Sequence, residues 1–277
     1  MKMKKFISSM IMALIVLLVL LPINVKANSY VNSDSLKITD VVTYKTGDSN
    51  ISSGTITIGN NNGAVTRASA PVGTIGWRIS NQYLDGKSQF TFHIDSLTGV
   101  RPTSISVVLN ISLRHGVMDA PKLYGGRTFT FNAAEIKPGA SKSATVDATT
   151  GYLAAFGSCT AFSPDGHPNT WALATSTILT NKKNEYFPNY IDPVSKKQAI
   201  DGIRTDWLKT GSRPWNGRNT YIKNFESQYG KQSENYWKSV QIHHIRPRNF
   251  GGSDEFDNLM PVETNAHRLI TKWFVSY

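Results

Sequence analysis

Apolar residues recur at every second position over much of the chain between residues 30 and 179. Successive side chains of a β-strand point to opposite faces of a sheet, so this spacing predicts strands with one buried face. The clearest run extends from residue 105 to residue 113. The positions that we expect to face a core are Ile56, Ile58, Phe90, Phe92, Ile94, Ile105, Val107, Leu109, Ile111, Leu113, Phe129 and Phe131.

Turn-forming residues separate these runs, for example at residues 59–63 and 137–139. Many short strands between turn signals are typical of an antiparallel sandwich or barrel. We therefore predict that residues 28–185 form a β-rich domain with an antiparallel β-sandwich-like fold. No motif within it indicates a ligand, so the sequence leaves its role open.

Beyond a linker rich in Tyr and Pro, helical spacing replaces the alternation. Ala199, Ile203 and Leu208 would lie on one face of a helix that begins after Asp192-Pro193. A second short helix is expected at residues 221–229.

The last part of the chain combines both kinds of spacing. We expect a strand at residues 240–244, a flexible turn at 251–254, a returning strand at 258–262 and a helix at 263–274. Residues 190–277 are therefore predicted to form a second, mixed domain. Together with the β-rich domain, this gives an α+β fold class.

The N-terminus has the features of an export signal. Lysines in the first five residues precede an almost continuously apolar run, Ile7–Leu21, and Ala27 offers a small residue for cleavage. The run of about 15 residues is shorter than the ~20 that cross a bilayer. We predict a signal peptide at residues 1–27, a secreted protein, and no stable membrane insertion after cleavage.

The chain carries a formal net charge of +11, and loss of the four lysines in the predicted signal leaves 11 − 4 = +7. A basic balance is compatible with nucleic acid, anionic envelope polymers or anionic membranes as partners, and selects none of them. Cys159 is the single cysteine, which excludes a disulfide within one chain. We expect it to be a small buried side chain.

Three of the six histidines lie close together in the sequence, at residues 243, 244 and 267. His243 from a strand and His267 from a helix could hold a first-row metal ion and leave open positions for catalysis. His244 could act as a general base, because a free imidazole has a pKa near 6.5. Adjacent strand residues point to opposite faces, so both histidines reach one site only if the strand ends, bulges or twists there.

Residues 240–275 resemble the HNH (ββα-metal) endonuclease family. The motif positions, in family order, are His243-His244, Pro247, Gly251-Gly252-Ser253-Asp254, Asn258-Leu259, Pro261 and His267. The resemblance implies that His244 activates water and that His243 and His267 bind the metal ion. It further implies that Asn258 either pins the loop that holds His244 or lends its side chain to the metal. Family members cut DNA, sometimes RNA, and leave 5′-phosphate and 3′-hydroxyl ends.

One departure from the family concerns the metal. Many bacteriocin-type members carry another histidine where this chain has Thr271, one helical turn after His267. A hydroxyl or a water would replace the missing imidazole, which favours a hard ion such as magnesium over tightly bound zinc. The resemblance leaves one divalent ion open among Mg, Mn, Zn and Ni. Arg246 and Arg268, next to the histidines, are candidate phosphate contacts, although solvated surface charge explains each of them equally well.

These features predict a secreted, metal-dependent endonuclease with DNA favoured over RNA as substrate. Its role would be that of an antibacterial toxin, which requires an immunity protein in the producer, or that of a scavenger of extracellular DNA. The alternative is a non-enzymatic cell-surface or extracellular binding protein whose C-terminal domain is a degenerate metal-binding fold. A purely structural metal knuckle would need four protein ligands, and no thiolates are near to complete them.

Overall fold

The computed structural model describes residues 49–58 and 73–277, all of which belong to one compact unit. The predicted signal peptide and the turn predicted at residues 59–63 lie outside the described residues. No helix within these ranges has the length and hydrophobicity that crossing a bilayer requires.

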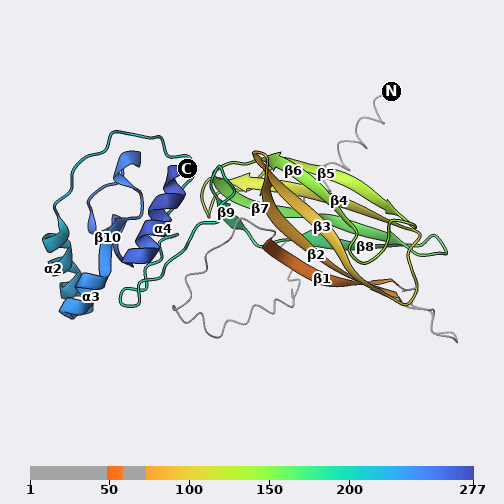
Figure 1. Ribbon diagram of the computed structural model, residues 1–277, viewed down its shortest axis with the longest axis horizontal. Helices are drawn as coiled ribbons and strands as arrows, with labels where there is room; N and C mark the ends of the chain where they lie inside the picture. Colours follow the sequence, from red (N-terminus) through yellow and green to blue (C-terminus); the bar gives the residue numbers. More distant parts are fainter. Residues whose placement is uncertain (1–48, 59–72) are drawn as a thin grey trace, which may run out of the picture. The chain divides into compact units, whose positions relative to one another are not determined.

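Two antiparallel sheets make up the part of the described chain that precedes residue 181 (Figure 1). The first sheet has the order β1-β2-β3-β6, and the second has the order β5-β4-β7-β8, with β9 paired to β7. The strands are β1 (Ser49–Ile58), β2 (Gly73–Leu84), β3 (Lys87–Thr98), β4 (Ser104–Arg114), β5 (Lys122–Asn132), β6 (Ser141–Asp147), β7 (Gly151–Phe162), β8 (Pro168–Ala174) and β9 (Ile178–Thr180).

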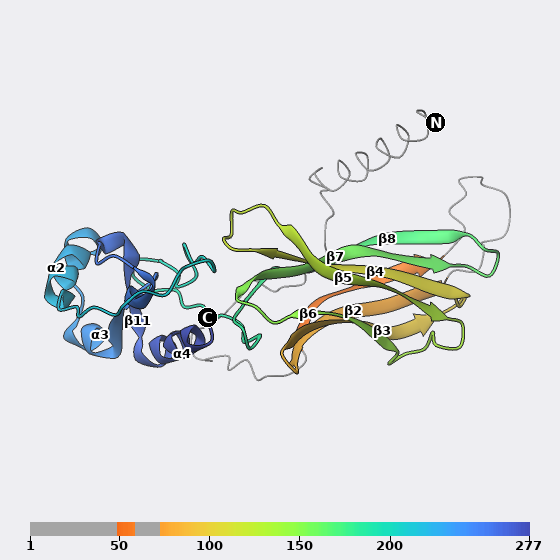
Figure 2. The same cartoon turned by 90° about the horizontal axis from the view of Figure 1, so that it is seen from above.

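The two sheets face each other across one hydrophobic core (Figure 2). Of the expected inward positions, only Leu113 at the end of β4 is half-buried, and the other eleven are buried. Phe92 of β3 meets the opposite sheet, because its ring contacts that of Phe131 in β5, and Phe90 of β3 is buried in the same core. The predicted β-rich, antiparallel architecture is therefore confirmed. Cys159 is buried in this core, as expected, and burial raises the pKa of its thiol to about 12.

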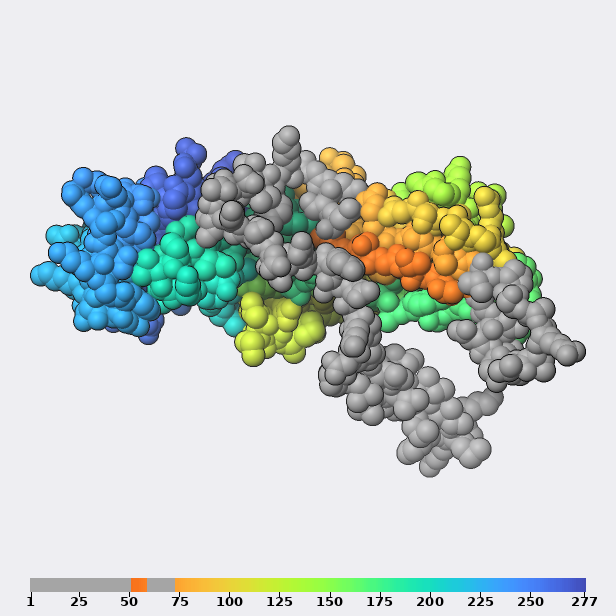
Figure 3. Space-filling view, turned by 90° about the horizontal axis from the view of Figure 1, so that it is seen from below, coloured from red at the N-terminus to blue at the C-terminus, as the bar shows by residue number. Residues whose placement is uncertain are grey.

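The sheets also meet at their edge strands, where β5 lies beside β6 and β1 lies beside β8. Figure 3 shows β1, in orange, beside the green β8, and Ser52 Oγ donates a hydrogen bond to the carbonyl of Ala174 at 3.0 Å. Each of these strands has only one partner within its own sheet, so the contact covers part of an otherwise open edge.

The prediction of a helix after Asp192-Pro193 is wrong, because residues 191–216 contain no helix. Ala199 and Ile203 are buried, but Leu208 is 81% exposed, so the three do not share a face. The Asp192 carboxylate accepts hydrogen bonds from both the backbone N–H and the hydroxyl of Ser195, at 2.7 and 2.6 Å. Such local side-chain bonds offer the backbone an alternative to the helix.

The remaining elements follow this segment. They are α2 (Arg218–Tyr229), α3 (Glu234–Ser239), β10 (Val240–His244), η1 (Arg248–Phe250), η2 (Phe256–Asn258), β11 (Leu259–Glu263) and α4 (Thr264–Val275). β10 and β11 form a two-stranded antiparallel sheet, and α2 packs against it through Phe225, Ile242 and Leu259. The predicted strand, strand and helix agree with β10, β11 and α4 to within one residue, and the second predicted helix lies within α2. The sequence reasoning missed α3, whose first turn is capped by the Ser233 hydroxyl.

A second core joins strands of the larger sheet to the C-terminal elements. Tyr152 of β7 and Leu179 of β9 are buried together with Met260, Ile270 and Trp273. The apolar face of α4 therefore packs on β11 and on residues contributed by the preceding β-rich region.

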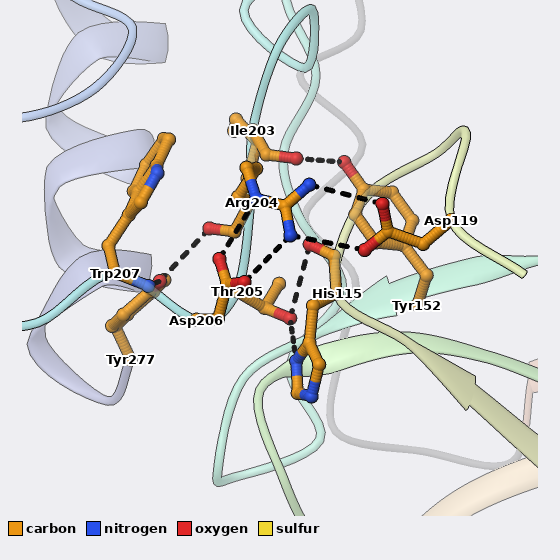
Figure 4. Close-up of polar contacts among 9 residues, drawn as sticks. All are labelled: His115, Asp119, Tyr152, Ile203, Arg204, Thr205, Asp206, Trp207 and Tyr277. Atoms are coloured by element: carbon orange, nitrogen blue, oxygen red, sulfur yellow. Dashed lines mark hydrogen bonds and ion pairs between the residues drawn. The ribbon is translucent and has the colours of Figure 1, made fainter. Parts of the chain in front are cut away.

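A strap of residues 203–207 lies beside this core (Figure 4). The Tyr152 hydroxyl donates to the carbonyl of Ile203 at 2.9 Å. Arg204 forms two hydrogen bonds with the carboxylate of Asp119, at 3.1 and 3.2 Å. The strap thus fixes the chain that leads from the β-rich region towards α2.

Candidate functional site

His243 and His267 face each other between β10 and α4. Their ring centroids lie 5.3 Å apart, with the ring planes nearly perpendicular at 81°. His243 is 5% exposed, and its buried Nε2 has no hydrogen-bond partner in the part of the chain that the structure describes. A buried polar nitrogen without a partner is costly, so its persistence here suggests a ligand that the protein itself does not supply.

This pair has the spacing of two imidazoles on one metal ion. Two histidines that ligate a tetrahedral zinc, with Zn–N bonds of about 2.1 Å, have ring centroids about 5 Å apart. Burial lowers the pKa of His267, and burial with the nearby His267 and His244 lowers that of His243 to about 3. Both rings are therefore neutral near pH 7, which is the ligating form. Within residues 49–58 and 73–277, no group of three or more His, Cys, Asp or Glu side chains is arranged to hold a metal ion.

His244 is the last residue of β10 and has different contacts from its neighbour. Its Nε2 lies 2.8 Å from Asp254 Oδ1, and its ring meets the Trp215 ring edge-on at 5.1 Å. The pairing of β10 with β11 has no register shift, so the two adjacent histidines contact different partners. A charge on His244 nevertheless lowers the pKa of both His243 and His267, so the three rings share one electrostatic neighbourhood.

Asn258 pins the loop that follows His244. Its Oδ1 accepts a hydrogen bond from Arg246 N at 2.9 Å, and its Nδ2 donates to the carbonyls of Arg246 and Ser253 at 3.1 and 2.8 Å. The resemblance implies either that this side chain pins the loop or that it binds the metal, and these hydrogen bonds correspond to pinning the loop.

Two glycines allow the same loop to close. Gly251 has φ +78°, a left-handed conformation that suits glycine. A Cβ on Gly252 would lie 1.8 Å from the carbonyl oxygen of Arg246, so any side chain there would displace the backbone. Backbone conformation and steric contact therefore explain the two glycines of the Gly-Gly-Ser-Asp turn.

Comparison with protein-family models, curated proteins and solved structures finds no match. The chemistry of the site is therefore argued from its geometry.

The two arginines predicted near the histidines differ in their surroundings. Arg246 donates from Nε to the carbonyl of Phe250 at 2.7 Å, and its guanidinium lies 5.5 Å from the centre of the Trp207 ring. Arg246 therefore has a clear structural role in the loop. Arg268 is exposed and lines a cleft of about 340 Å³ along α4, together with His267 and Thr271.

Sequence reasoning assigned no role to Asp254, Arg213 or Trp215, although all three surround His244. Arg213 forms an ion pair with Asp254, and Trp215 packs on the histidine ring. Asp254 belongs to the turn predicted at residues 251–254, but a turn pattern does not indicate which side chain the aspartate contacts. Arg213 and Trp215 lie about thirty residues upstream in an irregular segment, and no local pattern connects them to the histidines.

Proposed function

We propose that residues 190–277 form a metal-dependent endonuclease that hydrolyses the phosphodiester bonds of nucleic acid. One observation carries the proposal: the ring of His243 lies against the ring of His267, and its buried Nε2 has no hydrogen-bond partner among the described residues. The order β10, β11, α4 and the loop-pinning bonds of Asn258 add support, because both agree with what the HNH resemblance implies.

His243 and His267 would hold one divalent ion. When bound, such an ion polarises the phosphate and stabilises the charge on the leaving oxygen. The remaining positions would be filled by water, since no third protein ligand is arranged with the pair among the described residues. Thr271 lines the same cleft as His267, so its hydroxyl could bind one of these waters. Mg, Mn, Zn and Ni remain the candidate ions.

His244 would accept a proton from water as the water oxygen attacks phosphorus. The bond from phosphorus to the 3′ oxygen then breaks, and this oxygen takes a proton from solvent. The ends are a 5′-phosphate and a 3′-hydroxyl, as the resemblance implies. Arg268, exposed in the cleft beside His267, would contact the phosphate backbone.

We further propose that the protein is exported and that DNA is the favoured substrate. The export signal expected at residues 1–27 supports export, and the positive net charge is compatible with a nucleic-acid substrate. The order of export signal, β-rich domain and nuclease suits an antibacterial toxin, whose producer would need an immunity protein.

The test is a nicking assay with supercoiled plasmid, and a parallel assay with RNA, in Mg, Mn, Zn or Ni, with and without EDTA. We expect cleavage that EDTA abolishes. His244→Ala should lower the rate by about 10²- to 10⁴-fold, the usual contribution of a general base, while still binding metal. His167→Ala is the matched control, because His167 is exposed on the loop between β7 and β8.

The outcome also separates the two functional classes. Intact plasmid and intact RNA with all four metals would exclude the nuclease and favour a non-enzymatic binding protein. Equal cleavage by wild type and His244→Ala would retain an enzyme but reassign its base.

A further inference from the structure

We propose that Asp254, held by Arg213, is a positioning residue that fixes the ring orientation and the tautomer of His244. The catalytic meaning of this inference rests on the proposed function. The contact itself rests on geometry that can be measured without any activity.

The Asp254 carboxylate is bound on both oxygens. Oδ1 lies 2.8 Å from His244 Nε2, and Oδ2 forms an ion pair with Arg213. Arg213 is itself held, because its second terminal nitrogen donates to the carbonyl of Gly252 at 2.8 Å. The carboxylate is therefore oriented from one side by the guanidinium and presents its other oxygen to the imidazole.

This arrangement decides which nitrogen of His244 carries the hydrogen. The Arg213 guanidinium holds the pKa of Asp254 at about 2, so the side chain is a carboxylate near neutral pH. A carboxylate only accepts hydrogen bonds, so Nε2 of His244 must be the donor. The lone pair of the neutral ring then lies on Nδ1, and Nδ1 is the nitrogen that can take a proton from water.

Trp215 stabilises the same orientation from another direction. Its ring stands at 83° to the imidazole, with the centroids 5.1 Å apart. A Cβ on Gly217 would lie 2.6 Å from the indole nitrogen of Trp215, so the glycine leaves room for this ring. The indole would therefore hinder any rotation of the imidazole that moves Nε2 away from Asp254.

A base oriented by a third group is a common design for proton transfer, because both position and tautomer must be correct when the proton moves. Loss of the orienting carboxylate should therefore lower kcat and leave the KM for nucleic acid and the metal affinity nearly unchanged. A residue that only supported the loop would alter all three quantities.

The first experiment reads the tautomer directly by long-range ¹H–¹⁵N correlation of the imidazole rings in metal-free protein, with His244 assigned from a His244→Gln variant. We expect the Nε2–H pattern for wild type and its loss in Asp254→Ala. Asp257→Ala is the matched control, because Asp257 is exposed in the same loop. An Nδ1–H pattern in wild type, or an unchanged pattern in Asp254→Ala, would overturn the inference.

The second experiment is a double-mutant cycle on kcat. In the wild-type background, Asp254→Ala should lower kcat by at least about tenfold. This loss should not exceed the 10²- to 10⁴-fold that a general base supplies. In the His244→Ala background, the same substitution should lower kcat by less than about twofold. Equal losses in both backgrounds would contradict a role through His244. Arg213→Gln, which leaves Asp254 in place, should act in the same direction with a smaller effect and guards against misfolding of Asp254→Ala. If wild type has no activity at all, the proposed function fails, and the tautomer measurement alone decides the Asp254 contact.

Discussion

The side chain of Asn258 bonds both backbone polar groups of Arg246. Oδ1 accepts from the Arg246 N–H at 2.9 Å, and Nδ2 donates to its carbonyl at 3.1 Å. The same Nδ2 donates to the carbonyl of Ser253, the residue before Asp254. One amide thus closes the loop between β10 and β11 and places the carboxylate that meets His244.

Asn258→Ala should therefore lower the free energy of unfolding by about 2–3 kcal/mol, since three hydrogen bonds of about 1 kcal/mol each are lost. Asn258→Asp should be at least as harmful, because its second carboxylate oxygen would face two carbonyl oxygens. Urea unfolding measures both, with Asn169→Ala as a control that loses one long bond of 3.4 Å. An Asp variant as stable as wild type would contradict this account of the loop.

Gly252→Ala should destabilise the protein by at least about 2 kcal/mol. The added Cβ would lie 1.8 Å from the carbonyl oxygen of Arg246, which is already engaged by Asn258. Gly211→Ala is the matched control, because no atom of another described residue beyond its chain neighbours lies within 4 Å of its Cβ position. Thermal unfolding compares the two, and similar melting temperatures would show that the loop relaxes freely around residue 252.

In metal-free protein, His243 should make the free energy of unfolding decrease as the pH is lowered. Burial, reinforced by His267 and His244, lowers the pKa of His243 to about 3, whereas in the unfolded chain it is about 6.5. The unfolded state binds the proton more tightly, so this contribution is fully present above pH 6.5 and is lost as pH falls towards 3. We expect a loss of about 2 kcal/mol between pH 7.5 and pH 5 from this group.

The measurement for His243 is urea unfolding in EDTA at several pH values. His243→Leu should flatten the pH dependence by the same amount, while His244 and His267, whose pKa values are also lowered by burial, keep a smaller slope. Parallel curves for wild type and His243→Leu would show that the ring is not held neutral by burial.

Tyr152→Phe should cost about 1 kcal/mol of unfolding free energy. The buried Tyr152 hydroxyl donates to the carbonyl of Ile203, which would lose this partner in the second core. Tyr83→Phe, at a side chain 42% exposed, should change stability by less than about 0.5 kcal/mol. Equal effects of the two substitutions would mean that the strap is not fixed by this bond.

Arg268→Ala should weaken binding of nucleic acid and lower the salt dependence of that binding. Loss of one phosphate contact reduces the slope of log K against log salt by about 0.9. Binding is measured in EDTA, so that cleavage does not interfere. Arg101→Ala, at an exposed arginine of the β-rich region, is the control. Identical slopes for wild type and Arg268→Ala would remove this residue from the substrate contacts.

The strands were predictable because their signal is local. Alternation at Ile105, Val107 and Leu109 is set by the geometry of the extended chain, and all three are buried in the sandwich core. The absence of a helix at residues 191–216 was not predictable from spacing alone. Ala199 and Ile203 are four residues apart and buried, but they enter the second core from an irregular chain that includes a left-handed residue at Gly202.

Local sequence patterns were sufficient to locate the sheet-forming segments, the strands β10 and β11, the helix α4 and the histidines they carry, because side-chain periodicity and turn chemistry act over a few residues. The direction in which each histidine faces and the residues it contacts depend instead on tertiary packing. His243 faces His267 across two elements, while His244 meets Asp254 in the following loop and Trp215 from the segment before α2. Contacts between distant segments depend on how elements pack, and no spacing along the chain encodes them.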